Sequence, residues 1–192
     1  MRAVARELYG EVSALPIVSP HGHTDPAWFA TDAAFGNASQ LLLQPDHYVL
    51  RMLYSQGVPL DELIGEADPR SAWRLFAEGY HLFHGTPSRI WLDWVFAEAF
   101  GLDVRLEADT ADLYFDTITE ALQRPEFRPR ALFDRFGIEV IATTESPLDP
   151  LEHHRAIRES GWNGRVITAY RPDPVVDPEY ADDKGGFQAN LD

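Results

Sequence analysis

The chain has 192 residues, of which 45% are hydrophobic and 12% aromatic, a composition that can bury a substantial core and excludes a disordered chain. Sixteen basic residues against thirty-one acidic ones give a net charge of −15, which argues against nucleic acids and anionic membranes as partners. Cysteine is absent, and neither a membrane-spanning apolar run nor a signal peptide is recognisable, so a reducing, cytoplasmic compartment is expected.

The first predicted elements are a helix over residues 2–13 and a short strand over residues 17–19. In the helix, Val4, Leu8 and Val12 recur at a spacing that places them on one face. A proline directly after the strand ends its apolar run and predicts a turn at that point.

Two histidines, His21 and His23, follow this strand in a His-Gly-His sequence. In extended backbone the two side chains project to the same side, and Gly22 between them lets the backbone approach a bound group. Two imidazoles at the end of a buried strand form half of a site for a divalent metal such as zinc. Because the chain has seven histidines, a chance pair with a structural or solvent-exposed role is the alternative interpretation.

Residues 26–45 are predicted to form a polar, irregular connection, and helices follow it. Asp46 is a good N-cap for a helix that ends at Gln56, before a glycine. Tyr48 and Arg51 lie three residues apart and therefore share one face of this helix.

Further helices are predicted over residues 70–83, 87–100, 110–123 and 128–136. Aromatic residues, Trp91 and Trp94 among them, recur in the second of these at helical spacing. Packing in a core explains such a stripe better than a cofactor site does.

The last part of the chain is predicted as strand 138–142, helix 150–160 and strand 165–170. A strand, helix and strand in this order form a right-handed βαβ unit, which requires a parallel sheet.

Polar residues follow both of these strands, as they do at the carboxyl-terminal rim of a (β/α) barrel. Thr143, Thr144 and Glu145 follow the first strand, and Arg171 follows the second. Glu145 in this position could orient another group. Since a complete barrel needs eight strands and about 250 residues, the chain is expected to stop within the fold, in a polar tail at 182–186.

Four stretches together carry a resemblance to one known family: Ile17–His23 (IVSPHGH), Asp46–Val58 (DHYVLRMLYSQGV), Thr143–His154 (TTESPLDPLEHH) and Tyr170–Asp173 (YRPD). They resemble the uronate isomerases (glucuronate isomerase family) of the amidohydrolase superfamily, occur in the family's order and span nearly the whole chain. The resemblance implies an α/β fold, a distorted (β/α)₈ barrel with a large helical insertion after the first strand. It implies an N-terminal helix and first strand in residues 1–45, the insertion in 46–136, and strands two and three in 137–192.

The resemblance also implies an aldose–ketose isomerisation, of D-glucuronate to D-fructuronate and of D-galacturonate to D-tagaturonate. The implied partner is thus a small sugar acid, and the implied cofactor is a divalent metal, expected to be Zn²⁺. Homo-oligomerisation is left open. The implied site residues are the catalytic Tyr48 and Arg171, the substrate-binding Arg51, Arg171 and Asp173, and the metal-binding His21 and His23.

The residue types suit this chemistry. Moving a carbonyl from C1 to C2 passes through an enediol-like intermediate, whose oxyanion requires electrostatic stabilisation. A metal on the two histidines could polarise a substrate oxygen, and the planar guanidinium of Arg171 suits bidentate capture of a carboxylate or enediolate. Proton transfer and hydride shift both remain open.

Two other functions remain open from the sequence: a metal-dependent hydrolase of the same superfamily and a non-catalytic helical binding domain with an accidental histidine pair. Arg51 could form a surface ion pair with Asp46 or Asp61, and Tyr48 could be a packed helix residue. Because the remaining ligands and acid–base groups of the family lie on later strands, this chain alone is expected to be inactive. The other histidines, expected to have surface or structural roles, are His47, His81, His84, His153 and His154.

Overall fold

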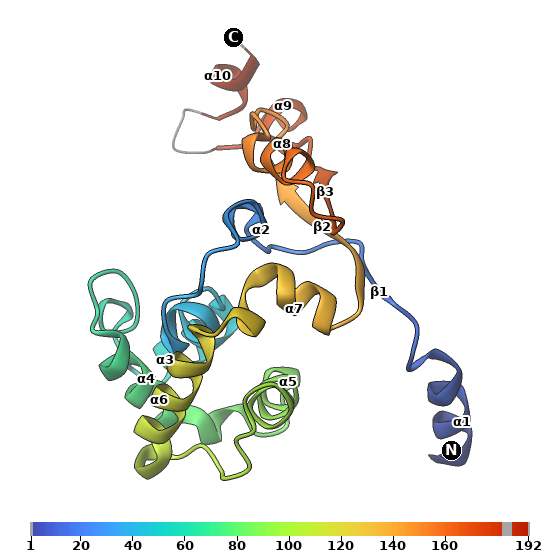
Figure 1. Cartoon of the computed structure of the whole chain (residues 1–192). Coiled ribbons are helices and arrows are strands. Elements are labelled where there is room, and N and C mark those ends of the chain that lie inside the picture. The colour runs from blue at the N-terminus through green and yellow to red at the C-terminus, as the bar shows by residue number, and fades with distance from the viewer. Residues whose placement is uncertain (1, 182–185, 192) are drawn as a thin grey trace. The chain divides into compact units, whose positions relative to one another are not determined.

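The computed structural model describes residues 2–181 and 186–191 of the chain, and Figure 1 labels their helices and strands. The predicted polar tail at 182–186 lies outside the described residues, except for Gly186. In the part of the chain that the structure describes, no helix has both the length and the apolar composition needed to cross a membrane.

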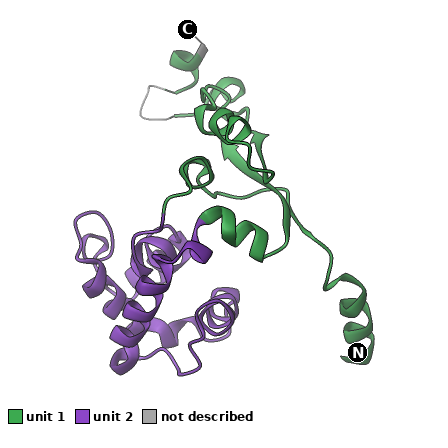
Figure 2. Ribbon diagram, in the orientation of Figure 1, with its two compact units in different colours: residues 1–33, 129–192 green, residues 34–128 purple. Residues whose placement is uncertain are grey.

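The chain divides into two compact units, which Figure 2 distinguishes by colour. Residues 1–33 and 129–192 form the first unit, and residues 34–128 form the second. The second unit lies in the sequence between the first and second strands, and most of the predicted helical region 46–136 falls within it.

The first unit combines helices with three strands (Figure 1). Its elements are α1 (Arg2–Val12), β1 (Ile17–Ser19), α2 (Pro26–Thr31), α7 (Pro129–Arg135), β2 (Ile138–Glu145), α8 (Glu152–Glu159), β3 (Arg165–Tyr170), α9 (Asp173–Val176) and α10 (Phe187–Leu191). Helix α1 forms as predicted but buries none of its residues.

The three strands form one parallel sheet in the order β1-β2-β3, which confirms the predicted α/β class with a parallel sheet. Strand β2 is the central strand. It pairs with β3 without interruption from Val140 to Glu145, whereas its pairing with β1 contains a register shift between Ile17 and Val18. Parallel direction places the carboxyl ends of all three strands at one edge of the sheet.

Strand β2 is longer than predicted, because it runs to Glu145 instead of ending at Ala142. Thr143 and Thr144 were interpreted as part of a polar turn, but they pair with Thr168 and Ala169 of β3. Polar side chains are compatible with a strand here because their hydroxyl groups find hydrogen-bond partners.

The prediction of an irregular connection over residues 26–45 was wrong in two places. Helix α2 begins at Pro26, directly after Asp25, whose carboxylate accepts a hydrogen bond from the Ala27 amide at 2.8 Å. A π-helix covers Ser39–Leu43. Both segments are shorter than two turns, so the apolar periodicity of a helix does not develop in them.

A small core joins the sheet of the first unit to its helices. Its buried residues are Phe29, Phe133, Ile141, Ile157 and Val166. The Phe29 ring stacks on Trp162 with centroids 5.7 Å apart, and Phe133 meets the same indole edge-on. This packing fixes α2, α7 and α8 against the strands.

The second unit, residues 34–128, consists of helices joined by loops and contains no strand. Its α-helices are α3 (His47–Ser55), α4 (Pro69–Gly79), α5 (Pro87–Trp94) and α6 (Ala111–Leu122), and the shorter 3₁₀- and π-helical segments are Ser39–Leu43, Leu60–Glu62, Tyr80–Phe83, Val95–Ala99, Ala108–Thr110 and Pro125–Phe127. The predicted N-cap of α3 is confirmed, since the Asp46 carboxylate accepts hydrogen bonds from the amides of Tyr48 and Val49 at 2.8 and 3.2 Å.

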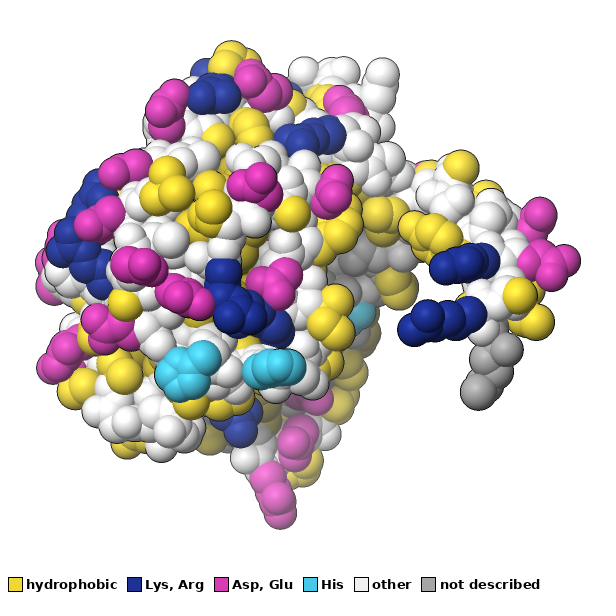
Figure 3. Space-filling model, turned by 90° about the horizontal axis from the view of Figure 1, so that it is seen from below, with side chains coloured by type: hydrophobic (Ala, Val, Ile, Leu, Met, Phe, Trp, Pro, Cys, Tyr) yellow, Lys and Arg dark blue, Asp and Glu magenta, His cyan; other side chains and the backbone are white. Residues whose placement is uncertain are grey.

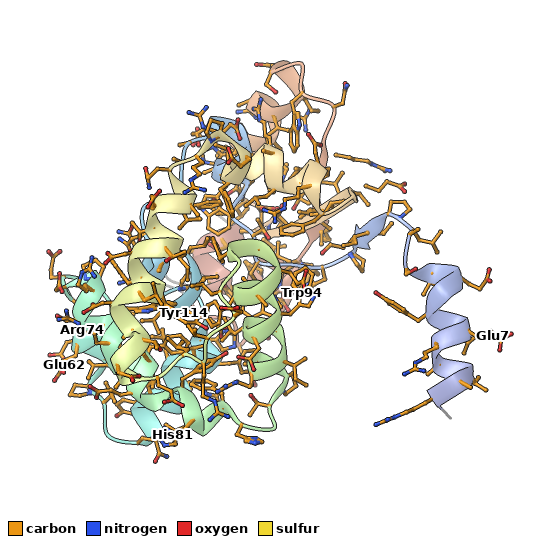
Figure 4. All side chains as sticks on the ribbon, turned by 60° about the horizontal axis from the view of Figure 1, so that its bottom comes forward. Glu7, Glu62, Arg74, His81, Trp94 and Tyr114 are labelled. Atoms are coloured by element: carbon orange, nitrogen blue, oxygen red, sulfur yellow. The ribbon has the colours of Figure 1, made fainter. Side chains whose placement is uncertain are left out.

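An aromatic core holds the second unit together. Trp73 and Phe76 are fully buried, with ring centroids 5.1 Å apart, and Tyr114 also points into the helices in Figure 4. The Tyr80 hydroxyl donates to Asp93 at 2.8 Å. Burial, followed by this hydrogen bond, raises the pKa of Tyr80 far above its ordinary value, so its hydroxyl stays a donor.

The prediction that Trp91 and Trp94 of α5 pack in a core was wrong. Their exposed fractions are 48% and 53%, whereas Leu92 and the following Phe96 are buried. Both pairs have a spacing that fits one face of a helix, so periodicity alone selected the wrong face.

On the face of the molecule seen in Figure 3, charged side chains of both signs lie side by side. On the second unit, Arg74 binds Asp112 through two nitrogens, at 3.0 and 2.8 Å, and Arg70 bridges Asp112 and Asp116. The hydrogen bonds from Arg74, and secondarily from Arg70, lower the pKa of the Asp112 carboxyl below its ordinary value.

This lowered pKa predicts a pH dependence of stability. The Asp112 carboxylate stabilises the folded unit above its ordinary pKa, and the contribution is lost as the pH falls through the lowered value. In urea unfolding between about pH 5 and pH 2, the unfolding free energy of Asp112→Asn should therefore decrease less steeply with falling pH than that of the unchanged protein. The exposed Asp109→Asn is measured beside it as a matched charge change, and a slope for Asp112→Asn equal to that of the unchanged protein would contradict the prediction.

Candidate functional site

The carboxyl ends of the three strands carry most of the residues predicted for the site. His21 and His23 follow β1, Thr144 and Glu145 end β2, and Arg171 follows β3. Because neighbouring strands are parallel, these residues lie along one edge of the sheet.

The two histidines stand close together in the turn after β1. Their ring centroids are 5.2 Å apart and the rings meet edge-on at 85°. Both residues are exposed, so each ring can present a nitrogen to a bound ion. Gly22 between them accepts a hydrogen bond through its carbonyl oxygen from the Thr144 hydroxyl of β2, at 3.2 Å.

The histidine pair provides two nitrogen ligands, whereas a tetrahedral zinc site requires four donors. Within the described ranges, 2–181 and 186–191, no group of three or more His, Cys, Asp or Glu residues is arranged to hold a metal. The donor type and the separation of the rings fit a divalent metal, and the pair would supply half of its ligands.

Two hollows open at this edge of the sheet, on either side of the end of β2. One, of about 190 Å³, is lined by His23, Thr24, Asp25, Pro26, Thr144 and Glu145. The other, of about 140 Å³, is lined by Thr144, Glu145, Ser146, Arg171, Asp173, Pro174 and Tyr180. Thr144 and Glu145 thus border both hollows and connect the histidine side with the arginine side.

Arg171 and Asp173 form a loose ion pair. The distance from Arg171 Nε to Asp173 Oδ2 is 3.6 Å, which is beyond hydrogen-bond range, and both side chains are 51% exposed. Exposed pairs of this kind contribute little to stability, so the guanidinium is available to an anionic ligand.

A buried polar cluster lies beneath the end of β2. The Thr143 hydroxyl is 2.9 Å from Glu145 Oε2 and 2.9 Å from His154 Nε2 of α8. The same hydroxyl oxygen is 3.1 Å from the carbonyl oxygen of Ile167 in β3. Thr143 is fully buried and His154 is 3% exposed, so this cluster ties β2 to both α8 and β3.

Tyr48 and Arg51 belong to the second unit, on α3. Tyr48 is 64% exposed, so the alternative interpretation of Tyr48 as a packed helix residue does not hold. The centroids of its ring and the His47 ring are 4.2 Å apart. Arg51 is exposed as well. The Asp46 carboxylate, one of its suggested ion-pair partners, caps the helix.

A larger hollow, of about 810 Å³, lies within the second unit beside His81, which Figure 4 labels. It contains none of the predicted site residues. Its Arg89 is bound to Asp93 at 2.8 Å and covers the Tyr80 ring at 3.9 Å. These contacts engage the arginine inside the unit.

Comparison with known proteins decides the family. The sequence matches the glucuronate isomerase family model over residues 1–187. The chain belongs to this family. The resemblance seen in the four sequence stretches is thereby confirmed.

Individual members of the glucuronate isomerase family agree with this assignment. The uronate isomerase of Rhizorhabdus wittichii is 73% identical over 100% of this chain, which covers 41% of that protein. The crystal structure of glucuronate isomerase from Caulobacter crescentus shares 60% identity with a TM-score of 0.91 and covers 95% of this chain and 39% of that one. A uronate isomerase structure from Thermotoga maritima shares 27% identity, with a TM-score of 0.83, over 90% of this chain and 38% of that one. The chain therefore spans about two fifths of its relatives' length.

The sequence of this glucuronate isomerase family member did not predict two polar contacts. His154 was expected at the surface or in a structural role, but its burial against Thr143 was not foreseen. Its position three residues before the buried Ile157 is a signal that could have indicated an inward-facing side chain. The contact of Thr144 with the histidine turn had no signal in the sequence, because it depends on how β1 pairs with β2.

Proposed function

We propose that this chain is part of a uronate isomerase that interconverts D-glucuronate with D-fructuronate and D-galacturonate with D-tagaturonate. The observation that carries the proposal is the placement of His21, His23 and Arg171 along one edge of a parallel sheet, in a member of the glucuronate isomerase family. The full-length protein is taken to be a longer polypeptide, of its relatives' length, in which this chain occurs.

The proposed fold of the full-length protein is a distorted (β/α)₈ barrel of the amidohydrolase superfamily. Two features support it: the strands here are parallel, and a separate helical unit is inserted between β1 and β2. In such a barrel the edge that carries the site residues is the catalytic rim.

Each proposed site residue has a chemical role. His21 and His23 would hold a divalent metal, proposed to be Zn²⁺, which when bound polarises a carbonyl or hydroxyl oxygen. The exposed guanidinium of Arg171 binds the sugar carboxylate or the enediolate, and Asp173 orients it by charge.

The helical unit contributes two further proposed contacts. Tyr48 donates a hydrogen bond to a sugar oxygen or moves a proton there, and Arg51 binds the sugar acid. Both side chains are exposed on α3, as contact with a small substrate requires. The reaction is proposed for the cytoplasm, in keeping with the absence of cysteine.

Product analysis tests this function directly. The full-length protein should convert D-glucuronate to D-fructuronate without a change in mass, whereas a hydrolase would consume water and a binding domain would give no product. The 192-residue chain alone should be inactive, because it supplies only two metal ligands among its described residues. Turnover by the isolated chain, or a hydrolysed product, would contradict the proposal.

Removal of the histidine pair should abolish metal binding. In the full-length protein, the double variant His21→Ala, His23→Ala is expected to retain less than about a tenth of the bound metal after dialysis, measured by elemental analysis. His84→Ala, which removes an exposed histidine of the helical unit, serves as the control and should retain the metal. Undiminished metal content in the double variant would assign the pair no ligand role.

Arg171→Lys separates charge from geometry. Lysine keeps the positive charge but cannot form two parallel hydrogen bonds to a carboxylate or enediolate. We expect kcat/KM for D-glucuronate to fall about ten- to hundredfold, with an unchanged circular dichroism spectrum. Arg158→Lys changes an exposed arginine of α8 that lines neither hollow at the carboxyl ends of the strands, and its kinetics should stay within about twofold of those of the unchanged protein.

A further inference from the structure

The Thr144 hydroxyl makes two contacts with the turn after β1. Its oxygen is 3.2 Å from the carbonyl oxygen of Gly22 and 3.3 Å from Nδ1 of His23. Through this side chain the end of β2 touches the histidine turn, beyond the point where β1 itself stops at Ser19.

The number of hydrogens in this group determines the direction of each bond. A threonine hydroxyl has one hydrogen, and a carbonyl oxygen can only accept. Both contacts are therefore satisfied together when Thr144 donates to Gly22 and the His23 Nδ1–H donates to the Thr144 oxygen. In that arrangement Nδ1 is engaged and the lone pair of Nε2 is left for a ligand.

The place of Thr144 is itself fixed from the opposite face of the strand. Successive side chains of a strand point to opposite faces, so Thr143 projects from the face opposite to that of Thr144. Its hydroxyl is the centre of the buried cluster, with His154 Nε2 and Glu145 Oε2 each 2.9 Å from it. This cluster anchors the strand segment from which the Thr144 hydroxyl projects.

We propose that Thr144 is a positioning residue, which selects the ring orientation and tautomer of His23 so that Nε2 faces the metal. The inference rests on the proposed function, because it gives Thr144 its role through the proposed metal site. Thr144 itself neither binds the metal nor touches the reacting atoms. A hydroxyl in this position does for His23 what a carboxylate or carbonyl does for other metal-binding histidines.

The test is the affinity of the full-length protein for Zn²⁺, measured by competition with a chromophoric chelator. Thr144→Val has nearly the same shape but no hydroxyl, and we expect about ten- to hundredfold weaker Zn²⁺ binding. Thr144→Ser keeps the hydroxyl and should restore the affinity to within about threefold. Thr168→Val removes a hydroxyl from the neighbouring strand and should leave Zn²⁺ binding unchanged.

A double-variant comparison distinguishes positioning from general support of the sheet. If Thr144 acts only through His23, then Thr144→Val should weaken Zn²⁺ binding in a His21→Ala background but have no further effect in a His23→Ala background. Equal losses in both backgrounds, or unchanged affinity of Thr144→Val, would overturn the inference. If Thr144→Val loses its native circular dichroism spectrum, Thr144→Ala replaces it, and its Zn²⁺ affinity is compared with that of Thr144→Ser by the same criteria.

Failure of the underlying proposal gives a different result. If the unchanged full-length protein binds no Zn²⁺ and forms no fructuronate, the proposed function fails, and the role of Thr144 fails with it. If the protein binds Zn²⁺ and isomerises glucuronate while Thr144→Val binds the metal as tightly as before, only the role of Thr144 is wrong.

Discussion

Parallel pairing of β2 with both neighbouring strands is the constraint on which the candidate site depends. It brings three carboxyl ends to one edge, although β1 and β2 are separated in the sequence by the whole helical unit. An antiparallel partner would place the histidine turn and Arg171 at opposite edges. The direction of the strands determines which side chains reach the same edge of the sheet, and every contact at the candidate site depends on it.

Because successive side chains of a strand alternate between its two faces, Thr143 and Thr144 at the end of β2 contact different parts of the structure. Thr143 lies on the face covered by α8, where the buried His154 satisfies its hydroxyl. Thr144 lies on the other face and meets the histidine turn. A one-residue change of register would exchange these faces and break both sets of contacts. The unbroken pairing of β2 with β3 thus also fixes which face of the sheet Thr143 and Thr144 project from.

Much of this arrangement could be predicted from local patterns in the sequence. The apolar runs of β1 and β3 gave their bounds correctly, and Asp46 marked the start of α3. The end of β2 was missed because threonine and glutamate in a parallel strand look like a turn until their partners are known. Trp91 was assigned to a core because helical spacing identifies a face without showing what covers it.

For the candidate site, the location could be predicted from the sequence, but the hydrogen bonds could not. Strand order and direction are enough to place His21, His23 and Arg171 at one edge. The hydrogen bonds of Thr144 and Thr143 are not, because each joins residues far apart in the sequence at a distance set by strand register. Roles for Tyr48 and Arg51 came from the family resemblance, and no local pattern on α3 would have suggested them.

The insertion of a helical unit between β1 and β2 has a consequence for folding kinetics. Strands β2 and β3 are joined by a single short helix, so a small loop closes when they pair, whereas pairing of β1 must close a loop containing residues 34–128. The entropy lost on closure increases with loop length, and a prefolded helical unit shortens the effective loop. The histidine turn is therefore expected to take its place after the helical unit has folded. A substitution in the core of the helical unit is therefore expected to delay assembly of this edge of the sheet without changing any of the residues at that edge.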